Sequence, residues 1–309
     1  EVRKREAADR EREALEAIFK GTGGLIAVHA EDEKRMEDRL PMMEGRTDIA
    51  AHAEWRDDVT ALIATKLAVE LAQASGHRLH ILHLTSGIEA DWLENITVLP
   101  SKATGKDAII TTETLPQHLT FDETDVAREG TRLQMNPPVR YKKDRETLWK
   151  QLKSGTVQCI ATDHAPHTLE AKALGFPKAP SGMPGVETSL AVMLTHANDG
   201  ACSIEDVVRW MSTNVADCYN MVGKGRLEEG ADGDVVLVDM NNARTVSDEH
   251  TWTGVGWNPF RGRSLVGWAQ VTVVAGVPVF ERSIETGPKG ALLVEPGSVG
   301  EPLVMTPWS

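Results

Sequence analysis

Residues that could bind a metal or transfer a proton lie at the end of a short apolar run, or directly after it, at three places in this sequence. The side chains are imidazoles and a carboxylate, which are ligands that zinc accepts. The carboxyl ends of parallel strands meet on one face of a (β/α) barrel, so such residues would converge there. A single Asp or His at the end of a strand also fits an ordinary capped turn. Because the same arrangement recurs at three strand ends, a metal site is the favoured interpretation. The residues are His29, after the run 25–28, His83, at the end of the run 79–84, and Asp163, after the run 157–162.

The remaining histidines divide by position. His80 and His83 are three residues apart on a predicted strand and point to opposite faces, and we assign His83, nearer the strand end, to the site. His118 and His164 are candidates for groups that orient a ligand imidazole. The pattern leaves the role of His52 open.

Apolar strand patterns alternate with helical patterns over residues 1–220, which is typical of a parallel α/β fold. From about Gly230 the chain is β-rich with turn glycines. We therefore predict a partial TIM-like (β/α) barrel over residues 1–228 and a small β-rich domain with a C-terminal tail over 229–309. The predicted barrel strands are 25–28, 79–84, 108–113 and 157–162, the helices are 3–20, 57–74, 88–93, 144–152, 187–197 and 204–215, and a polar loop is expected after Asp32, as far as about Ala53.

Composition narrows the classes of partner. The net charge of −13 disfavours binding to nucleic acid or to an anionic membrane. No apolar run approaches the ~20 residues of a membrane span, and the charged first residues do not resemble a signal peptide. Cys159, Cys202 and Cys218 form no Cys-x-x-Cys, which suits a reducing compartment and disfavours a thiolate zinc site. We expect a cytoplasmic protein.

Six segments resemble the C-terminal two-thirds of dihydroorotases, members of the cyclic amidohydrolases. The resemblance runs from about residue 10 to 280. Met135-Asn136-Pro137-Pro138 and Thr162-Asp163-His164-Ala165-Pro166-His167 favour dihydroorotase over allantoinase or hydantoinase. The segments are 27–32, 82–86, 112–119, 135–140, 161–167 and 181–188.

The resemblance implies a zinc enzyme that interconverts N-carbamoyl-L-aspartate and dihydroorotate in pyrimidine biosynthesis. It also implies a small-molecule substrate, with a homodimer or aspartate carbamoyltransferase as possible partners. By the same resemblance, His29, His83 and Asp163 bind zinc, Asp163 is the general acid/base, and Asn136, His167, Pro184 and Gly185 hold the substrate.

One departure from the family pattern is large. Dihydroorotases carry His-x-His followed by a substrate-binding Arg, and no His-x-His occurs in these 309 residues. We expect an N-terminally truncated chain with an incomplete site for one or two zinc ions, and little activity by itself. The alternatives are an allantoinase-like or hydantoinase-like amidohydrolase, and a non-catalytic scaffold subunit for aspartate carbamoyltransferase.

Overall fold

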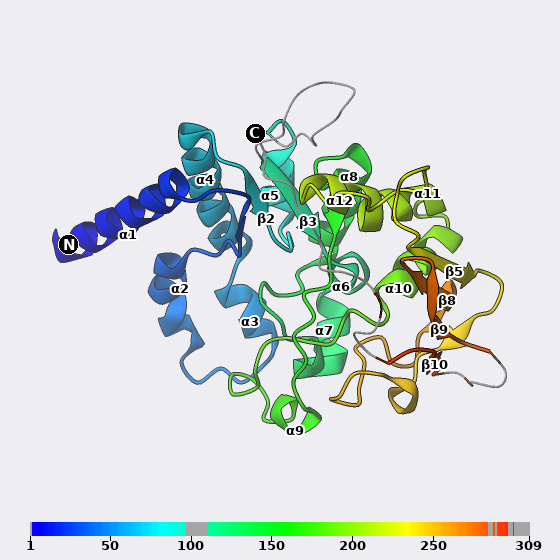
Figure 1. Ribbon diagram of the computed structural model, residues 1–309. Coiled ribbons are helices and arrows are strands. Elements are labelled where there is room, and N and C mark those ends of the chain that lie inside the picture. The colour runs from blue at the N-terminus through cyan, green and yellow to red at the C-terminus, as the bar shows by residue number, and fades with distance from the viewer. Residues whose placement is uncertain (1, 97–109, 284–286, 288, 296–298, 300–309) are drawn as a thin grey trace.

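A parallel sheet forms the centre of the computed structural model, which describes residues 2–96, 110–283, 287, 289–295 and 299 (Figure 1). The strand order β1-β2-β3-β4 follows the chain, as expected for successive units of a (β/α) barrel. The register places Ala27 beside His80 and His80 beside Thr111. The strands are β1 (Ile26–Val28), β2 (Leu79–Ile81), β3 (Ile110–Thr114) and β4 (Cys159–Ile160).

Helices connect these strands and bury their outer face. The longest, α4 (Asp58–Ser75), starts where the Asp57 side chain accepts from the Thr60 amide, and stops at Gly76, whose φ is 67°. Such a left-handed residue suits glycine and ends the helix. Leu79 and Ile81 are fully buried between the helices. The predicted barrel with a β domain is thereby confirmed. The other crossover helices are α5 (Gly87–Leu93) and α8 (Lys142–Ser154), and α1 (Val2–Gly21) precedes β1.

The predicted polar loop before Ala53 is wrong. That segment contains α2 (Glu33–Arg39), a 3-10 turn (Leu40–Met43) and α3 (Ala50–Trp55). Asp32 starts α2 by accepting from the Arg35 amide at 2.7 Å, and Trp55 Nε1 donates to the Met36 carbonyl at 2.9 Å. These helices are too short to show a clear apolar periodicity, and tertiary contacts stabilise them.

The other predicted helices are present, with shifted ends. The helix predicted over 204–215 is divided by a π-helical turn (Arg209–Thr213), and residues 108 and 109 of the third predicted strand lie outside the described residues. The remaining helices are α6 (Pro116–Thr120), α7 (Glu123–Glu129), a 3-10 turn (Gly130–Leu133), α9 (Leu169–Lys172), α10 (Ser189–Asn198), α11 (Ile204–Val208), α12 (Asn214–Cys218) and a 3-10 turn (Asp248–His250).

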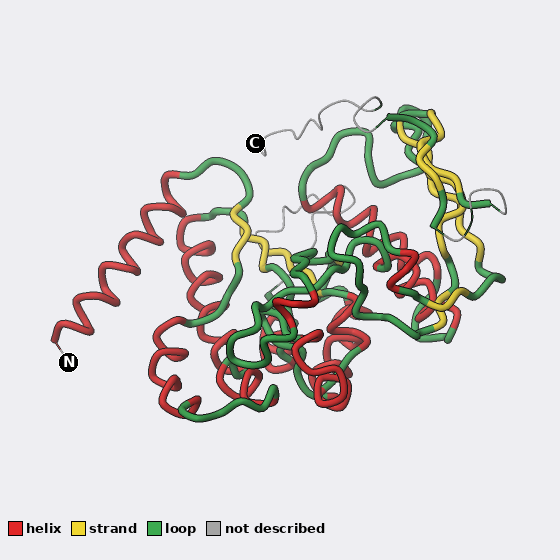
Figure 2. Tube along the Cα trace, turned by 90° about the horizontal axis from the view of Figure 1, so that it is seen from below, coloured by secondary structure: helices red, strands yellow, loops and turns green. Residues whose placement is uncertain are grey.

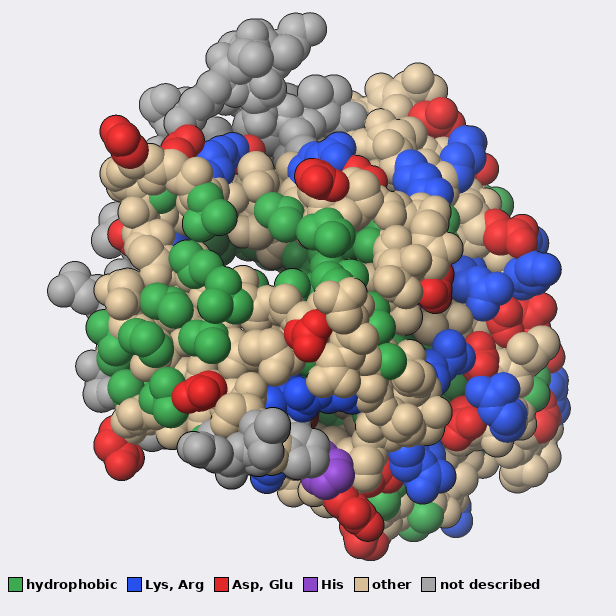
Figure 3. Space-filling model, turned by 90° about the vertical axis from the view of Figure 1, so that its right-hand side faces the viewer, with side chains coloured by type: hydrophobic (Ala, Val, Ile, Leu, Met, Phe, Trp, Pro, Cys, Tyr) green, Lys and Arg blue, Asp and Glu red, His purple; other side chains and the backbone are tan. Residues whose placement is uncertain are grey.

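An antiparallel sheet of order β10-β9-β8-β5 forms the β domain, at the opposite end of the molecule from α1 (Figure 2). Apolar side chains gather on the face seen in Figure 3. In the β domain, Val236 and Leu237 of β5 are exposed. The strands are β5 (Val235–Asp239), β8 (Trp268–Val274), β9 (Val277–Glu281) and β10 (Ala291–Leu292), and β6 (Arg244–Thr245) pairs with β7 (Ser264–Leu265).

Part of the C-terminal region packs into the barrel. Trp257 and Phe260 are buried in one core with Leu115 and Phe121, and the Phe121 and Phe260 rings stack at 4.8 Å. The division at residue 228 stays a prediction. Across the described ranges, no helix combines the length and apolar character needed to cross a membrane.

Candidate active site

Two of the predicted metal ligands touch. His29 follows β1, His83 follows β2, and these strands are neighbours in the sheet. His29 Nδ1 lies 3.0 Å from His83 Nε2, and the ring centroids are 4.7 Å apart. The structure therefore brings together, at the carboxyl ends of adjacent strands, two imidazoles that are 54 residues apart in sequence.

Glu31 orients the His29 imidazole. Its Oε2 accepts from His29 Nε2 at 3.0 Å, and Arg56 donates to the same carboxylate at 2.5 Å and 3.0 Å. Although burial alone would raise the pKa of Glu31, these two partners hold it below its usual value. A proton on Nε2 leaves the Nδ1 lone pair directed at His83. Carboxylate–histidine pairs of this kind fix the tautomer of metal-binding histidines.

His83 occupies a more constrained position. It is 6% exposed, and its backbone amide donates to Glu113 Oε1 at 3.4 Å. Burial, together with the charge of His29, lowers the pKa of His83, whereas Asp163 and Glu113 oppose that change.

Backbone strain coincides with the predicted site. His83 has φ 37° and Asp163 has φ 43°, two of four non-glycine residues with positive φ in the described chain. This region costs roughly 1–3 kcal/mol for such residues and is commonly found where a site imposes it. Asp163 is half-buried and follows β4, so both strained residues lie just beyond strand ends.

The two histidines match part of a metal site. Two nitrogens that bind one tetrahedral zinc at ~2.0–2.1 Å lie about 3.3 Å apart, close to the 3.0 Å between His29 Nδ1 and His83 Nε2. To offer Nε2 as a ligand, His83 must carry its proton on Nδ1, which is buried and lacks a hydrogen-bond partner within the described residues. Among those same residues, no three His, Cys, Asp or Glu side chains converge as a metal requires.

Asn136 is oriented by the histidine whose role the sequence left open. His52 Nε2 lies 3.0 Å from Asn136 Oδ1, and His52 is 4% exposed. Burial lowers the pKa of His52 to about 4, so its ring is neutral near pH 7. A neutral ring with its proton on Nε2 donates to Oδ1 and leaves the Asn136 amide NH2 group free to contact a ligand.

His167 and the Pro184-Gly185 segment lie on two loops that pack closely. His167 Nε2 donates to the Ser181 carbonyl at 3.1 Å, and the Gly185 amide donates to His164 Nδ1 at 3.1 Å. A Cβ on Gly185 would lie 2.8 Å from the Thr162 carbonyl oxygen, so only glycine allows this approach. His164 therefore holds the loop, and within the part of the chain that the structure describes it makes no hydrogen bond to His29 or His83.

Lys172 was not identified from the sequence. Its Nζ donates to the carbonyls of Gln134, Pro180 and Gly182 at 2.9, 2.9 and 2.8 Å, and the residue is 1% exposed. These bonds join the strand-like segment before Asn136 to the loop before Pro184. The only possible sequence signal was a lysine in a glycine- and proline-rich loop, which normally indicates a solvated surface.

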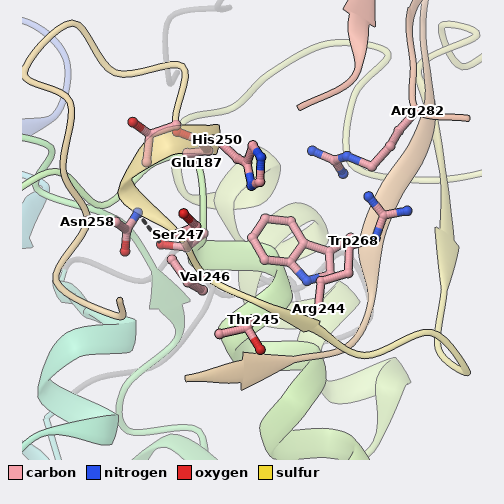
Figure 4. Close-up of a pocket in the computed structure, with 11 residues that line it drawn as sticks. Glu187, Arg244, Thr245, Val246, Ser247, His250, Asn258, Trp268 and Arg282 are labelled. Atoms are coloured by element: carbon pink, nitrogen blue, oxygen red, sulfur yellow. Dashed lines mark hydrogen bonds between the residues drawn. The ribbon is translucent and has the colours of Figure 1, made fainter. Parts of the chain in front are cut away.

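Two pockets adjoin these elements. A cavity of about 500 Å³ lies beside α3 and α7, and His52 and Arg140 are in its wall. A smaller pocket lies between α10 and the β domain, and Arg244 and Arg282 line it on the side of Trp268, with Glu187 beside His250 (Figure 4). Neither pocket is lined by His29, His83 or Asp163.

Comparison with known proteins agrees with this geometry. The model of the amidohydrolase family matches residues 10–279. The chain belongs to the amidohydrolase family. It is 34% identical over 259 residues to a dihydroorotase of Halobacterium salinarum, covering 83% of this chain and 57% of that protein. It is 31% identical over 293 residues to a dihydroorotase of Methanosarcina mazei, covering 94% of this chain and 64% of that protein. The chain thus spans less than two-thirds of the length of these two dihydroorotases.

Solved amidohydrolase structures share the fold. The L-hydantoinase (dihydropyrimidinase) of Arthrobacter aurescens superposes with a TM-score of 0.82 at 28% identity, over 92% of this chain and 62% of that one. The dihydropyrimidinase of Brevibacillus agri gives a TM-score of 0.76 at 28% identity, over 86% and 59%. The fold and family are shared with cyclic amide hydrolases, and that family generally uses a metal.

Proposed function

We propose that this chain forms part of the active site of a zinc-dependent dihydroorotase, which interconverts dihydroorotate and N-carbamoyl-L-aspartate in pyrimidine biosynthesis. The observation that carries the proposal is the 3.0 Å contact between His29 Nδ1 and His83 Nε2 at the carboxyl ends of adjacent strands. The similarity to dihydroorotases over 94% of the chain supports the choice of substrate.

In this proposal His29, His83 and Asp163 hold the metal. When bound, zinc supplies Lewis-acid activation of water and of the ring carbonyl at neutral pH. The Asp163 carboxylate accepts a proton from the attacking water and returns it to the ring nitrogen as the C–N bond breaks. Glu31 keeps the proton of His29 on Nε2, which reserves Nδ1 as the ligand atom.

The remaining residues orient the substrate. Because His52 occupies Asn136 Oδ1, Asn136 would donate from its NH2 group to a substrate oxygen. Because His167 Nε2 donates to Ser181, only its Nδ1 is left to meet the substrate carboxylate, and it would do so as a donor when protonated. Since the Gly185 amide is engaged by His164, the backbone at Pro184 and Gly185 would contact the pyrimidine ring through its carbonyl oxygens.

Zinc content tests the metal part of the proposal. We would dialyse the purified 309-residue chain against zinc and measure bound metal by mass spectrometry. His29→Ala and His83→Ala should each lower zinc retention by at least tenfold, and His250→Ala, at an exposed position, should not. Equal zinc retention by all four proteins would refute the ligand assignment.

Kinetics test the substrate and the division of roles. In the longest natural form of the protein, Asp163→Asn should abolish kcat with little change in substrate binding, whereas His167→Ala should raise KM more than it lowers kcat. Wild-type kcat in Asp163→Asn would reject the acid/base role, and zinc loss in His167→Ala would make His167 a ligand. The 309-residue chain alone should show little turnover.

A hydantoinase-like activity is the second candidate, because solved hydantoinases superpose well on this chain. Turnover of dihydroorotate, hydantoin and allantoin would be compared at equal zinc content. Highest kcat/KM for dihydroorotate supports the proposal, and highest kcat/KM for hydantoin or allantoin would replace it.

A further inference from the structure

A small pocket that the proposed reaction leaves unused lies between the start of α10 and the β domain (Figure 4). Arg244 of β6 and Arg282, which directly follows β9, both line it on the side of Trp268. Its volume is about 40 Å³, which is room for roughly three or four ordered waters. The exposed residues Thr245 and His250 also line the pocket, so a ligand can reach it from solvent.

The Arg282 side chain is buried and held in one orientation. Its guanidinium carbon lies 5.3 Å from the centre of the Trp268 ring and 5.2 Å from the centre of the Phe280 ring. Nη1 donates to the Ala269 carbonyl at 2.6 Å, and Nη2 donates to the Lys289 carbonyl at 3.5 Å. A guanidinium has five N–H donors, so these contacts fix its plane without using all of them. Arginine side chains held in this way are suited to the oxygens of phosphate and carboxylate groups.

The wall of the pocket carries more positive than negative charge. Two guanidinium groups, of Arg244 and Arg282, line it together with one carboxylate, that of Glu187. Glu187 is already engaged, because its Oε2 accepts from the Trp252 amide at 2.9 Å. Burial and the charge of Arg244 lower the pKa of Arg282, and Glu187 opposes this only in part. A bound anion would relieve the repulsion between the two cations, and it would do so in a chain whose net charge is −13.

Neutral groups complete the wall and hold it in place. Ser247 Oγ accepts from the Glu249 amide at 3.3 Å, which leaves the hydroxyl hydrogen of Ser247 as a donor for a ligand. Asn258 Nδ2 donates to Thr188 Oγ1 at 3.4 Å, so the loop after β6 is tied to the residue that precedes α10. The donors around the pocket therefore come from elements that the fold joins to one another.

We propose that this pocket binds a phosphate group, either as free phosphate or as the terminal group of a small phosphorylated molecule. A phosphate monoester carries about −1.5 to −2 charges at pH 7, so it gains more from two guanidinium groups than a carboxylate does. Its oxygens correspond in number to the roughly three or four waters that the pocket can hold. Because the pocket has no room for more, the rest of a larger ligand would lie at its mouth, near Thr245 and His250.

The pocket adjoins the loop that the proposed function assigns to the substrate. Glu187 and Thr188 line the pocket, and Glu187 follows Gly185 by two residues. A phosphate group held against this wall should restrict the loop, so we expect it to slow hydrogen exchange in residues 184–188. The inference goes beyond the proposed reaction, because it concerns a ligand that the reaction does not involve.

Titration calorimetry of the 309-residue chain with sodium phosphate at pH 7, at constant ionic strength, tests the proposal. Arg244→Gln should weaken phosphate binding about tenfold, because it removes a charged donor. Glu187→Gln, which removes a negative charge from the wall, should strengthen binding about threefold. Arg209→Gln is the matched control, because Arg209 is exposed and does not line the pocket, and it should not change the affinity.

A second titration, with glycerol 3-phosphate, identifies the source of the phosphate group by which of the two ligands binds more tightly. Circular dichroism checks that each variant is folded, and Glu187→Gln keeps the test decisive if Arg244→Gln does not fold. The proposal is overturned if the wild-type chain shows no saturable phosphate binding, if folded Arg244→Gln binds as tightly as Arg209→Gln, if Glu187→Gln binds more weakly than wild type, or if acetate binds as tightly as phosphate. None of these measurements uses dihydroorotase activity, so failure here leaves the proposed function untouched.

Discussion

Replacing Lys172 by Met should destabilise the protein and loosen the loop that carries Pro184 and Gly185. Methionine has a similar length and fills the same apolar space, but it cannot donate hydrogen bonds. The substitution leaves three buried carbonyl oxygens, of Gln134, Pro180 and Gly182, without the donor that now lies 2.8–2.9 Å away.

Two opposing energies decide the magnitude. An orphaned buried acceptor costs ~1–3 kcal/mol, so three cost about 6 kcal/mol at the middle of that range. Against this, burial lowers the pKa of Lys172 to about 8 from its ordinary 10.5, which corresponds to roughly 3 kcal/mol of charge-burial cost that Met relieves. The net expected loss is about 3 kcal/mol, or a fall in Tm of about 6 °C.

Urea unfolding at pH 7, followed by circular dichroism, measures this loss. Lys178→Met is the matched control, because Lys178 lies in the same segment but is exposed, and it should change stability by less than about 0.5 kcal/mol. Hydrogen exchange should rise in residues 180–186 of the Lys172 variant. Wild-type stability in Lys172→Met, or an equal loss in the control, would show that the three carbonyls do not depend on this ammonium group.

Three other substitutions have defined outcomes. Burial raises the pKa of Glu89 to about 7 from its ordinary 4.5, so the stability that the protonated carboxyl provides below pH 4.5 is lost as the pH rises through 7. The free energy of unfolding of Glu89→Gln should match that of wild type near pH 4.5 and exceed it by roughly 3 kcal/mol at pH 8. An equal difference at both pH values would contradict this. Gly185→Ala should cost ~1–3 kcal/mol in urea unfolding because its Cβ would lie 2.8 Å from a backbone oxygen, whereas Gly254→Ala, with nothing within 4 Å, should cost far less. His52→Phe should lower the free energy of unfolding by about 1 kcal/mol in the same assay, because it removes the donor to Asn136 Oδ1. An unchanged urea midpoint would mean that another donor replaces this hydrogen bond.

The order of the elements was predictable from the sequence because it depends on local patterns. Buried strands appear as short apolar runs and amphipathic helices as a period near 3.6, so β2 and α4 were found within a few residues of their ends. The same patterns placed His29, His83 and Asp163 after strands. The helices between Glu33 and Trp55 were missed because short segments carry little periodicity.

Which side chains meet was decided by the tertiary structure. Glu31 and Arg56 pair across 25 residues, His52 and Asn136 across 84, and Cys218 and His80 across 138. These contacts depend on strand register and on the paths of loops, and both follow from packing of the whole core. The sequence by itself thus determined the family, the parallel strand order and the residues available for chemistry. Only the folded chain determined their partners, because a hydrogen bond depends on distances of a few tenths of an ångström that no local pattern encodes.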